Sequence, residues 1–154
     1  MKIYLASPLF TECEKRNVGD YAAYLRKCGD EVYVPMEHQI EDAWSMPNHV
    51  WARMVFEEDR QAIDECDKVV CLYYGLYSDS GTAWECGYAY GIGKPVELVD
   101  YSGCECSLMV VQGAENSFEF ANKEQTWGSG PGRKNFTPLK QKNQVQIHWQ
   151  IAQK

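Results

Sequence analysis

Apolar positions along the first hundred residues change between two spacings, and this change predicts alternating strands and helices. Short apolar runs rich in β-branched and aromatic residues are typical of buried strands. Spacings of three and four residues are typical of helices that cover a sheet. The predicted strands span residues 2–6, 31–35, 68–73 and 95–99. The predicted helices span residues 12–28, 49–66 and 82–93.

The order of these elements predicts the fold class. Strands that alternate with helices form a parallel sheet with helices on its faces. We therefore expect an α/β protein with a doubly wound (flavodoxin/Rossmann-like) parallel sheet of about five strands, flanked by helices. Gly29 should end the first helix. The sheet-facing side of that helix should comprise Val18, Tyr21, Ala22 and Leu25.

The pattern weakens beyond about residue 113. The segment 115–154 is rich in Asn, Gln and Lys, and only residues 145–151 indicate a further strand. The glycine-rich run at 128–134 lacks the G-K-[ST] ending of a phosphate-binding loop, so we interpret it as a flexible connection. The length fits a single domain, 1–154, with a C-terminal segment from about residue 115 that the pattern does not explain.

Composition and charge argue against several classes of function. A net charge of −7, without a Lys/Arg cluster, argues against nucleic acid as a partner. No apolar stretch has the length of a membrane span or a signal-peptide core, so we expect no membrane partner. Seven cysteines, most of them within predicted elements, indicate reduced thiols and a cytoplasmic protein. Cys104 and Cys106 lack a histidine at zinc-binding spacing, and we expect neither a metal nor a cofactor.

Polar or turn-forming residues follow three of the predicted strands. Ser7, Gln39 and the turn-rich loop 75–81 come after the first, second and third strand. Ligands of doubly wound sheets bind beyond the carboxyl ends of the strands. We therefore expect the functional site at this edge of the sheet.

Glu85 is the first candidate for chemistry at this edge. It should lie in the first turn of the third predicted helix, where the positive helix end stabilises a carboxylate anion by about 0.3–1 kcal/mol at an exposed position. An ionised carboxylate can attack as a nucleophile. Thr82 and Glu85 also have the spacing of a capping box, so a purely structural role stays open.

Asp59 is the second candidate, because it falls on the apolar stripe of the second predicted helix. A buried charge costs several kcal/mol unless it is paired or lies in a polar cleft. A salt bridge with Arg53, Arg60 or a lysine, or rotation to the surface, would also explain Asp59. Two carboxylates near one sheet edge are the groups that glycoside chemistry requires. The remaining members of the stripe are Trp51, Val55, Ala62 and Cys66.

Four blocks of sequence resemble the nucleoside 2-deoxyribosyltransferases, and the resemblance runs from Lys2 to about Met109. Each block alone is a weak signal, but their common order is a strong one. The blocks are IYLASPLF at 3–10, YVPMEHQ at 33–39, VWA at 50–52 followed by Asp59, and DSGTAWECGYA at 79–89.

The resemblance implies roles for individual residues. Glu85 would be the nucleophile, Asp59 would exchange a proton with the leaving base, and Tyr4 would hydrogen-bond the catalytic carboxylate. Gln39 would contact the nucleobase, and Asp79 would bind the 5′-hydroxyl of the sugar. The full set of expected substrate-binding residues is Asp79, Gln39, Ser7, Phe10, Trp51, Gly81, Ser107 and Met109.

The implied activity is transfer of a 2-deoxyribosyl group between nucleobases through a deoxyribosyl-glutamate intermediate. The implied partners are deoxynucleosides, free nucleobases and further copies of the chain, in a dimer, tetramer or hexamer whose subunits share the site. The residues leave open whether the second step uses a base or water. A non-catalytic nucleoside-binding domain is a further alternative.

Two departures from the family bear on the substrate. Ser107-Leu108-Met109 stands where the family has Asn-Leu-Met, and a serine there resembles the deoxynucleoside 5′-monophosphate glycosidases. The segment from about residue 115 does not match the transferase tail. Asp79 argues for a free nucleoside, because two like charges about 4 Å apart cost on the order of 4 kcal/mol at an effective dielectric near 20.

Overall fold

The structure is a computed structural model that describes residues 1–75, 78–101, 107–120 and 136–138. The elements are β1 (Lys2–Ala6), α1 (Glu12–Lys27), β2 (Glu31–Tyr33), η1 (Pro35–Glu37), η2 (Ala43–Ser45), α2 (Asn48–Glu65), β3 (Lys68–Tyr73), α3 (Ser80–Gly91), β4 (Val96–Asp100), α4 (Leu108–Gly113), β5 (Asn116–Phe120) and β6 (Phe136–Pro138). The η elements are short 3-10 helices.

One sheet connects all the strands, in the order β2-β1-β3-β4-β5-β6. The pairs from β2 through to β5 are parallel, and β6 is antiparallel to β5. The strand order reverses between β1 and β3, and such a switch point forms the crevice in which doubly wound proteins bind ligands. The predicted α/β, doubly wound class is confirmed. The predicted number of strands, about five, differs from the observed sheet, which also contains the antiparallel β6.

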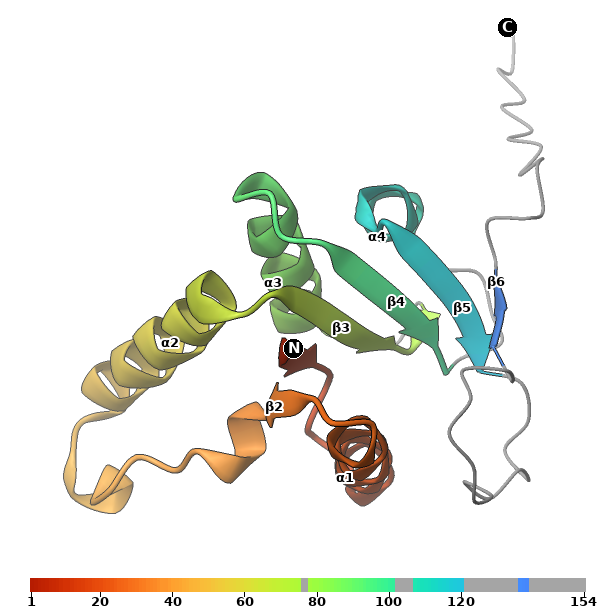
Figure 1. The fold of residues 1–154 in the computed structure, drawn as a ribbon. Helices are drawn as coiled ribbons and strands as arrows, with labels where there is room; N and C mark the ends of the chain where they lie inside the picture. Colours follow the sequence, from red (N-terminus) through yellow and green to blue (C-terminus); the bar gives the residue numbers. More distant parts are fainter. Residues whose placement is uncertain (76–77, 102–106, 121–135, 139–154) are drawn as a thin grey trace, which may run out of the picture.

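Helices cover both faces of the sheet (Figure 1): α1 lies on one face, and α2, α3 and α4 lie on the other. Successive residues of a strand point to opposite faces. Ile3 and Leu5 of β1 therefore pack with α1, while Tyr4 and Ala6 pack in the second core with residues of α2 and α3. This alternation places the Tyr4 side chain beneath α3.

The first helix and the central strand agree closely with the predictions. The four predicted core residues of α1 are buried, and Gly29 follows the helix with φ +93°. The third strand has the predicted bounds, 68–73. Local periodicity was sufficient here because each element packs along its whole length.

The apolar stripe of α2 was predicted less well. Ile63 is the buried residue within this helix, and Cys66 just after it is also buried. Trp51 in the first turn remains 44% exposed. The helix extends beyond the edge of the sheet (Figure 1), so the N-terminal half of its stripe has no sheet to cover.

The last described elements were not predicted. Helix α4 and strand β5 are short, and β5 pairs in parallel with β4. The predicted strand at 145–151, the connection at 128–134 and the Cys104/Cys106 pair lie outside the described residues.

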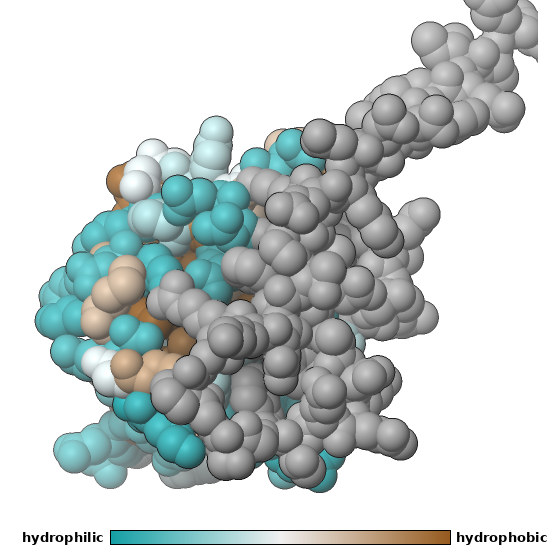
Figure 2. All heavy atoms as spheres, turned by 45° about the vertical axis from the view of Figure 1, so that its right-hand side comes forward, coloured by the Kyte–Doolittle hydropathy of each residue, from teal (hydrophilic) through white to brown (hydrophobic). Residues whose placement is uncertain are grey.

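On the side that Figure 2 shows, the described surface is mostly hydrophilic, with a smaller hydrophobic area among polar side chains. Within the described ranges, no helix combines the length and the apolar character that crossing a membrane requires.

Candidate active site

Tyr4 and Glu85 form the centre of the candidate site. The Tyr4 hydroxyl donates a hydrogen bond of 2.8 Å to Glu85 Oε1, joining the central strand β1 to helix α3. The Tyr4 side chain is fully buried, so the position of its hydroxyl is set by the core. The contact is the one that the family resemblance implies for these two residues; their catalytic role stays a prediction.

Asp59 lies on α2 and accepts a 3.3 Å hydrogen bond from the hydroxyl of Tyr33 on β2. The arginines that were alternative partners bind elsewhere: Arg53 pairs with Glu57, and Arg60 pairs with Glu57 and Asp64. Among the described residues, Asp59 makes no salt bridge, and its side-chain partner is the Tyr33 hydroxyl.

The two tyrosines connect the two carboxylates. Tyr4 and Tyr33 are register partners on adjacent parallel strands. Their rings stack with centroids 5.5 Å apart and planes 14° from parallel. Each hydroxyl then binds one carboxylate, that of Glu85 or that of Asp59.

Both carboxylates hold protons more tightly than usual. Burial raises the pKa of Glu85 to about 8, against the lowering effect of the hydrogen bond from Tyr4. Burial likewise raises the pKa of Asp59 to about 6, against the hydrogen bond from Tyr33. The negative charge of Asp59 also raises the pKa of Glu85. Paired carboxyl groups with raised pKa values are typical of acid–base sites.

The expected position of Glu85 in the first helical turn was wrong. Helix α3 begins at Ser80, which places Glu85 in its second turn, where the favourable effect of the helix end has largely decayed. The alternative capping box of Thr82 and Glu85 is also absent, because Asp79 caps the helix. Burial, and not the helix end, determines the charge state of Glu85.

The Asp79 side chain caps the N-terminus of α3. Its carboxylate accepts hydrogen bonds from the amides of Gly81 and Thr82, at 3.0 and 3.2 Å, and from the Thr82 hydroxyl. A Cβ added at Gly81 would lie 2.7 Å from Asp79 Oδ2, so a larger residue at this position would force the capping carboxylate to shift. Asp79 therefore has a structural task, whether or not it also binds sugar.

The remaining expected substrate-binding residues are spread over several loops and helix ends. Gln39 is exposed just after η1, and the Ser7 hydroxyl donates to the carbonyl of Pro8 at 3.1 Å. Ser107 precedes α4 and makes no side-chain capping bond to it. Phe10 and Met109 are 76% and 81% exposed.

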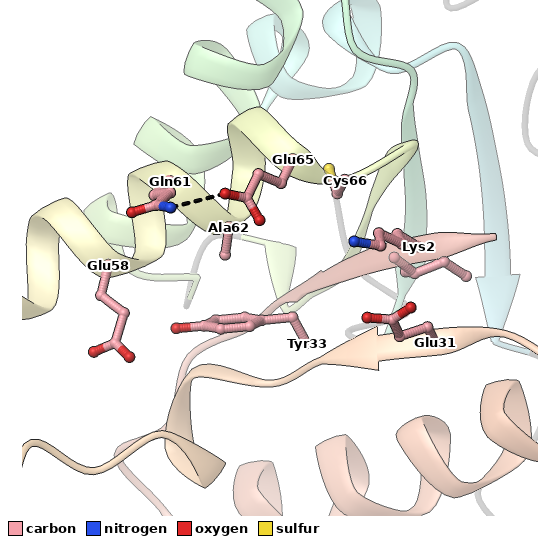
Figure 3. A pocket seen from close by; sticks show the side chains of 9 residues that line it. Lys2, Glu31, Tyr33, Glu58, Gln61, Ala62, Glu65 and Cys66 are labelled. Carbon is pink, nitrogen blue, oxygen red and sulfur yellow. Dashed lines mark hydrogen bonds between the residues drawn. The ribbon is translucent and has the colours of Figure 1, made fainter.

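A pocket of about 280 Å³ lies between α2 and the edge of the sheet formed by β1 and β2 (Figure 3). Tyr33 forms one wall, and Glu58 and Gln61 of α2 lie opposite. Neither Glu85 nor Asp59 lines this pocket. Tyr33 is the residue that this pocket shares with the candidate site.

Tyr33 and His38 are features of the site that sequence reasoning missed. The ring of His38 stacks on Tyr33 with centroids 4.0 Å apart and planes 11° from parallel. The available signal was the block at 33–39, which was interpreted only through Gln39. The hydrogen bond to Asp59 depends on how α2 crosses the sheet edge, which periodicity does not reveal.

The comparisons agree with this geometry. The family model for nucleoside 2-deoxyribosyltransferases matches residues 3–118. The chain belongs to this family. The family that the sequence blocks predicted is thereby confirmed, and the chain is an enzyme of the deoxyribosyltransferase or related N-glycosidase kind.

Solved structures show the same fold. The 2-deoxyribosyltransferase of Bacillus psychrosaccharolyticus is 34% identical over 77% of this chain and 86% of that chain, with a TM-score of 0.69. A conserved protein of Enterococcus faecalis V583 is 28% identical over 64% of this chain and 62% of that chain, with a TM-score of 0.54. The CMP N-glycosidase of Clostridium botulinum shares the fold at 20% identity over 77% of this chain and 87% of that chain, with a TM-score of 0.55. No curated protein matches the chain.

Proposed function

We propose that this cytoplasmic family member transfers the 2-deoxyribosyl group of deoxynucleosides between nucleobases. The observation that carries the proposal is the buried Tyr4–Glu85 hydrogen bond beside Asp59, because it provides an oriented carboxylate with a second titratable carboxyl group as neighbour. Glu85 is the proposed nucleophile and Asp59 the proposed acid and base.

The reaction is a double displacement. In the first step a carboxylate oxygen of Glu85 bonds to the anomeric carbon, the bond from that carbon to the base nitrogen breaks, and Asp59 gives its proton to the departing base. In the second step a new base attacks the anomeric carbon, the ester bond to Glu85 breaks, and Asp59 takes up the proton of the incoming base. Two inversions give net retention of configuration.

Asp79 supports a free nucleoside as the substrate. The amides at the start of a helix are a natural binding site for phosphate. In α3 the Gly81 and Thr82 amides are already bound by the Asp79 carboxylate, whose negative charge would repel a 5′-phosphate. Ser107 favours the second candidate, a deoxynucleoside 5′-monophosphate N-glycosidase, because its hydroxyl makes no capping bond.

A paired substrate assay tests the proposal. The protein is incubated with a deoxynucleoside or with its 5′-monophosphate, with and without free adenine, and the products are separated by chromatography. We expect a new deoxynucleoside only when nucleoside and adenine are both present. Base release from the monophosphate, without exchange on the nucleoside, would support the glycosidase. Binding of the nucleoside without any base release would support a non-catalytic domain.

Replacement of Asp79 separates helix capping from sugar binding. Asp79→Ala should lower the free energy of unfolding by about 0.5–2 kcal/mol, because the α3 amides lose their acceptor, whereas Asp79→Ser retains a capping oxygen. If the carboxylate also binds the 5′-hydroxyl, both variants raise the KM of the deoxynucleoside. Urea unfolding and steady-state kinetics on both variants measure the two effects. A wild-type KM in Asp79→Ser would restrict this residue to capping.

A shared site between copies of the chain is part of the proposal. Phe10, Trp51 and Met109 are expected to contact substrate, yet each exposes a large apolar surface in the single chain. A second subunit that packs against them would complete the site. A monomer by light scattering at assay concentration would contradict this arrangement.

A further inference from the structure

Tyr33 holds the proposed acid in place. Its hydroxyl donates the 3.3 Å hydrogen bond to Asp59, and the ring that carries this hydroxyl contacts an aromatic ring on each of two other segments. Tyr4 contacts it from the neighbouring strand β1, and His38 contacts it from the segment that follows η1. Figure 3 shows the Tyr33 side chain extending from β2 beneath α2, the helix that carries Asp59.

The segment that supplies His38 is itself fixed. The Arg26 guanidinium on α1 binds both carboxylate oxygens of Glu37, at 3.0 and 2.5 Å. It also donates to the carbonyl of Val32 on β2 at 2.9 Å. A bidentate arginine–carboxylate pair defines orientation as well as distance. His38, the next residue after Glu37, therefore meets the Tyr33 ring from an anchored backbone.

The charged and titratable groups around Asp59 come from each neighbouring element. Burial and Glu58 of α2 raise the pKa of Asp59, whereas the Tyr33 hydroxyl and His38 lower it. Glu85 of α3 interacts with the same carboxyl group. The Tyr33 hydrogen bond therefore counteracts the effect of burial on the pKa of Asp59. It stabilises the carboxylate that remains after Asp59 has given up its proton.

We infer that Tyr33 is a positioning residue for proton donation: it orients Asp59 towards the leaving base, and its stacking on Tyr4 fixes the acid relative to the nucleophile. The inference rests on the proposed function. It assigns to Tyr33 an effect on departure of the base and none on attack by Glu85. Loss of the Tyr33 hydroxyl should therefore slow the release only of those bases that require a proton in order to leave.

Tyr33→Phe tests this selectivity, since it removes the hydroxyl and keeps the stacked ring. Two substrates are compared at pH 6: deoxyadenosine, whose base leaves with a proton, and 7-methyl-2′-deoxyguanosine, whose cationic base leaves without one. We expect kcat/KM for deoxyadenosine to fall about tenfold, the factor of one hydrogen bond of ordinary strength. The kcat/KM for the methylated substrate should stay within about twofold of the wild-type value. The low-pH limb of the deoxyadenosine profile should move to higher pH, because Asp59 loses a donor that lowers its pKa.

Tyr88→Phe is the matched control. Tyr88 donates a 2.7 Å hydrogen bond to Asp64, another aspartate of α2, so this variant loses an equivalent tyrosine–aspartate contact. It should leave the ratio of the two substrates unchanged. His38→Ala, an exposed position where folding is not at risk, should give the same selective loss as Tyr33→Phe on a smaller scale.

The outcomes separate the inference from the proposed function. The positioning role alone would be overturned if the wild-type protein is active and Tyr33→Phe lowers kcat/KM equally for both substrates, or for neither. If the wild-type protein released base from neither substrate, the proposed function would fail and the inference with it.

Discussion

Replacing Glu85 with alanine is expected to abolish exchange of bases between a deoxynucleoside and free adenine. The variant loses the proposed nucleophile, and no other described carboxylate receives the Tyr4 hydrogen bond. Loss of a catalytic nucleophile lowers kcat by roughly a thousandfold or more. Chromatography of the mixed-base reaction measures the loss. Glu85→Gln, which keeps the volume and the Tyr4 contact, should be equally inactive.

The control and the intermediate make this result specific. Glu65→Gln changes an exposed glutamate of α2 that accepts a hydrogen bond from Gln61, and it should exchange bases at the wild-type rate. Wild-type protein incubated with a deoxynucleoside alone should gain the mass of one deoxyribosyl group on Glu85. Near-wild-type turnover in Glu85→Ala, or an active enzyme that never carries the sugar, would refute the double displacement.

The second large effect is a bell-shaped dependence of kcat/KM on pH, with limbs near 6 and 8. The proposed double displacement requires Glu85 ionised and Asp59 protonated, and therefore one proton on the pair. Below the pKa of Asp59, about 6, both groups are protonated and the nucleophile is lost. Above the pKa of Glu85, about 8, both are ionised and the acid is lost. The profile of kcat/KM reports these groups in the free enzyme.

This profile has a further property that distinguishes it from an ordinary acid–base pair. Between the limbs Glu85 holds the proton in most molecules, because its pKa is the higher of the two. Asp59→Asn should convert the bell into a single limb that rises with pH, because only ionisation of Glu85 remains. A descending limb that persists in Asp59→Asn would show that another group acts as the acid.

Much of the fold was predictable because its local patterns and its packing agree. Strand β3 is apolar and buried from Val69 onward, lies at the centre of the sheet, and was predicted with its observed bounds. Strand β5 was not predicted, because its sequence, Asn-Ser-Phe-Glu-Phe, is short and partly polar. Its pairing with β4 depends on tertiary structure. Trp51 shows the opposite error, since its spacing indicates a buried stripe although the sheet does not reach that far.

The parts of the candidate site that belong to sequence motifs were predictable. The parts that depend on how neighbouring strands align were not. Glu85 and Asp59 were proposed from spacing and from the family blocks; the structure pairs them with Tyr4 and Tyr33, and their catalytic roles stay predictions. The helix start was misplaced by two residues because Asp79, and not the neighbouring threonine, is the cap. The block at 33–39 did not reveal the role of Tyr33, because that role depends on pairing with Tyr4, 29 residues earlier, and such registry does not appear in a local pattern.

The edge position of β2 makes the two halves of the reaction unequally resistant to heat. Glu85, the proposed nucleophile, is anchored through Tyr4 to β1, which has neighbouring strands on both sides. Tyr33, in contrast, belongs to a three-residue strand that pairs with β1 alone. Short outer strands open at lower free energies than the centre of a sheet. A warmed enzyme should therefore lose its ability to expel ordinary bases while it still captures sugars from activated donors.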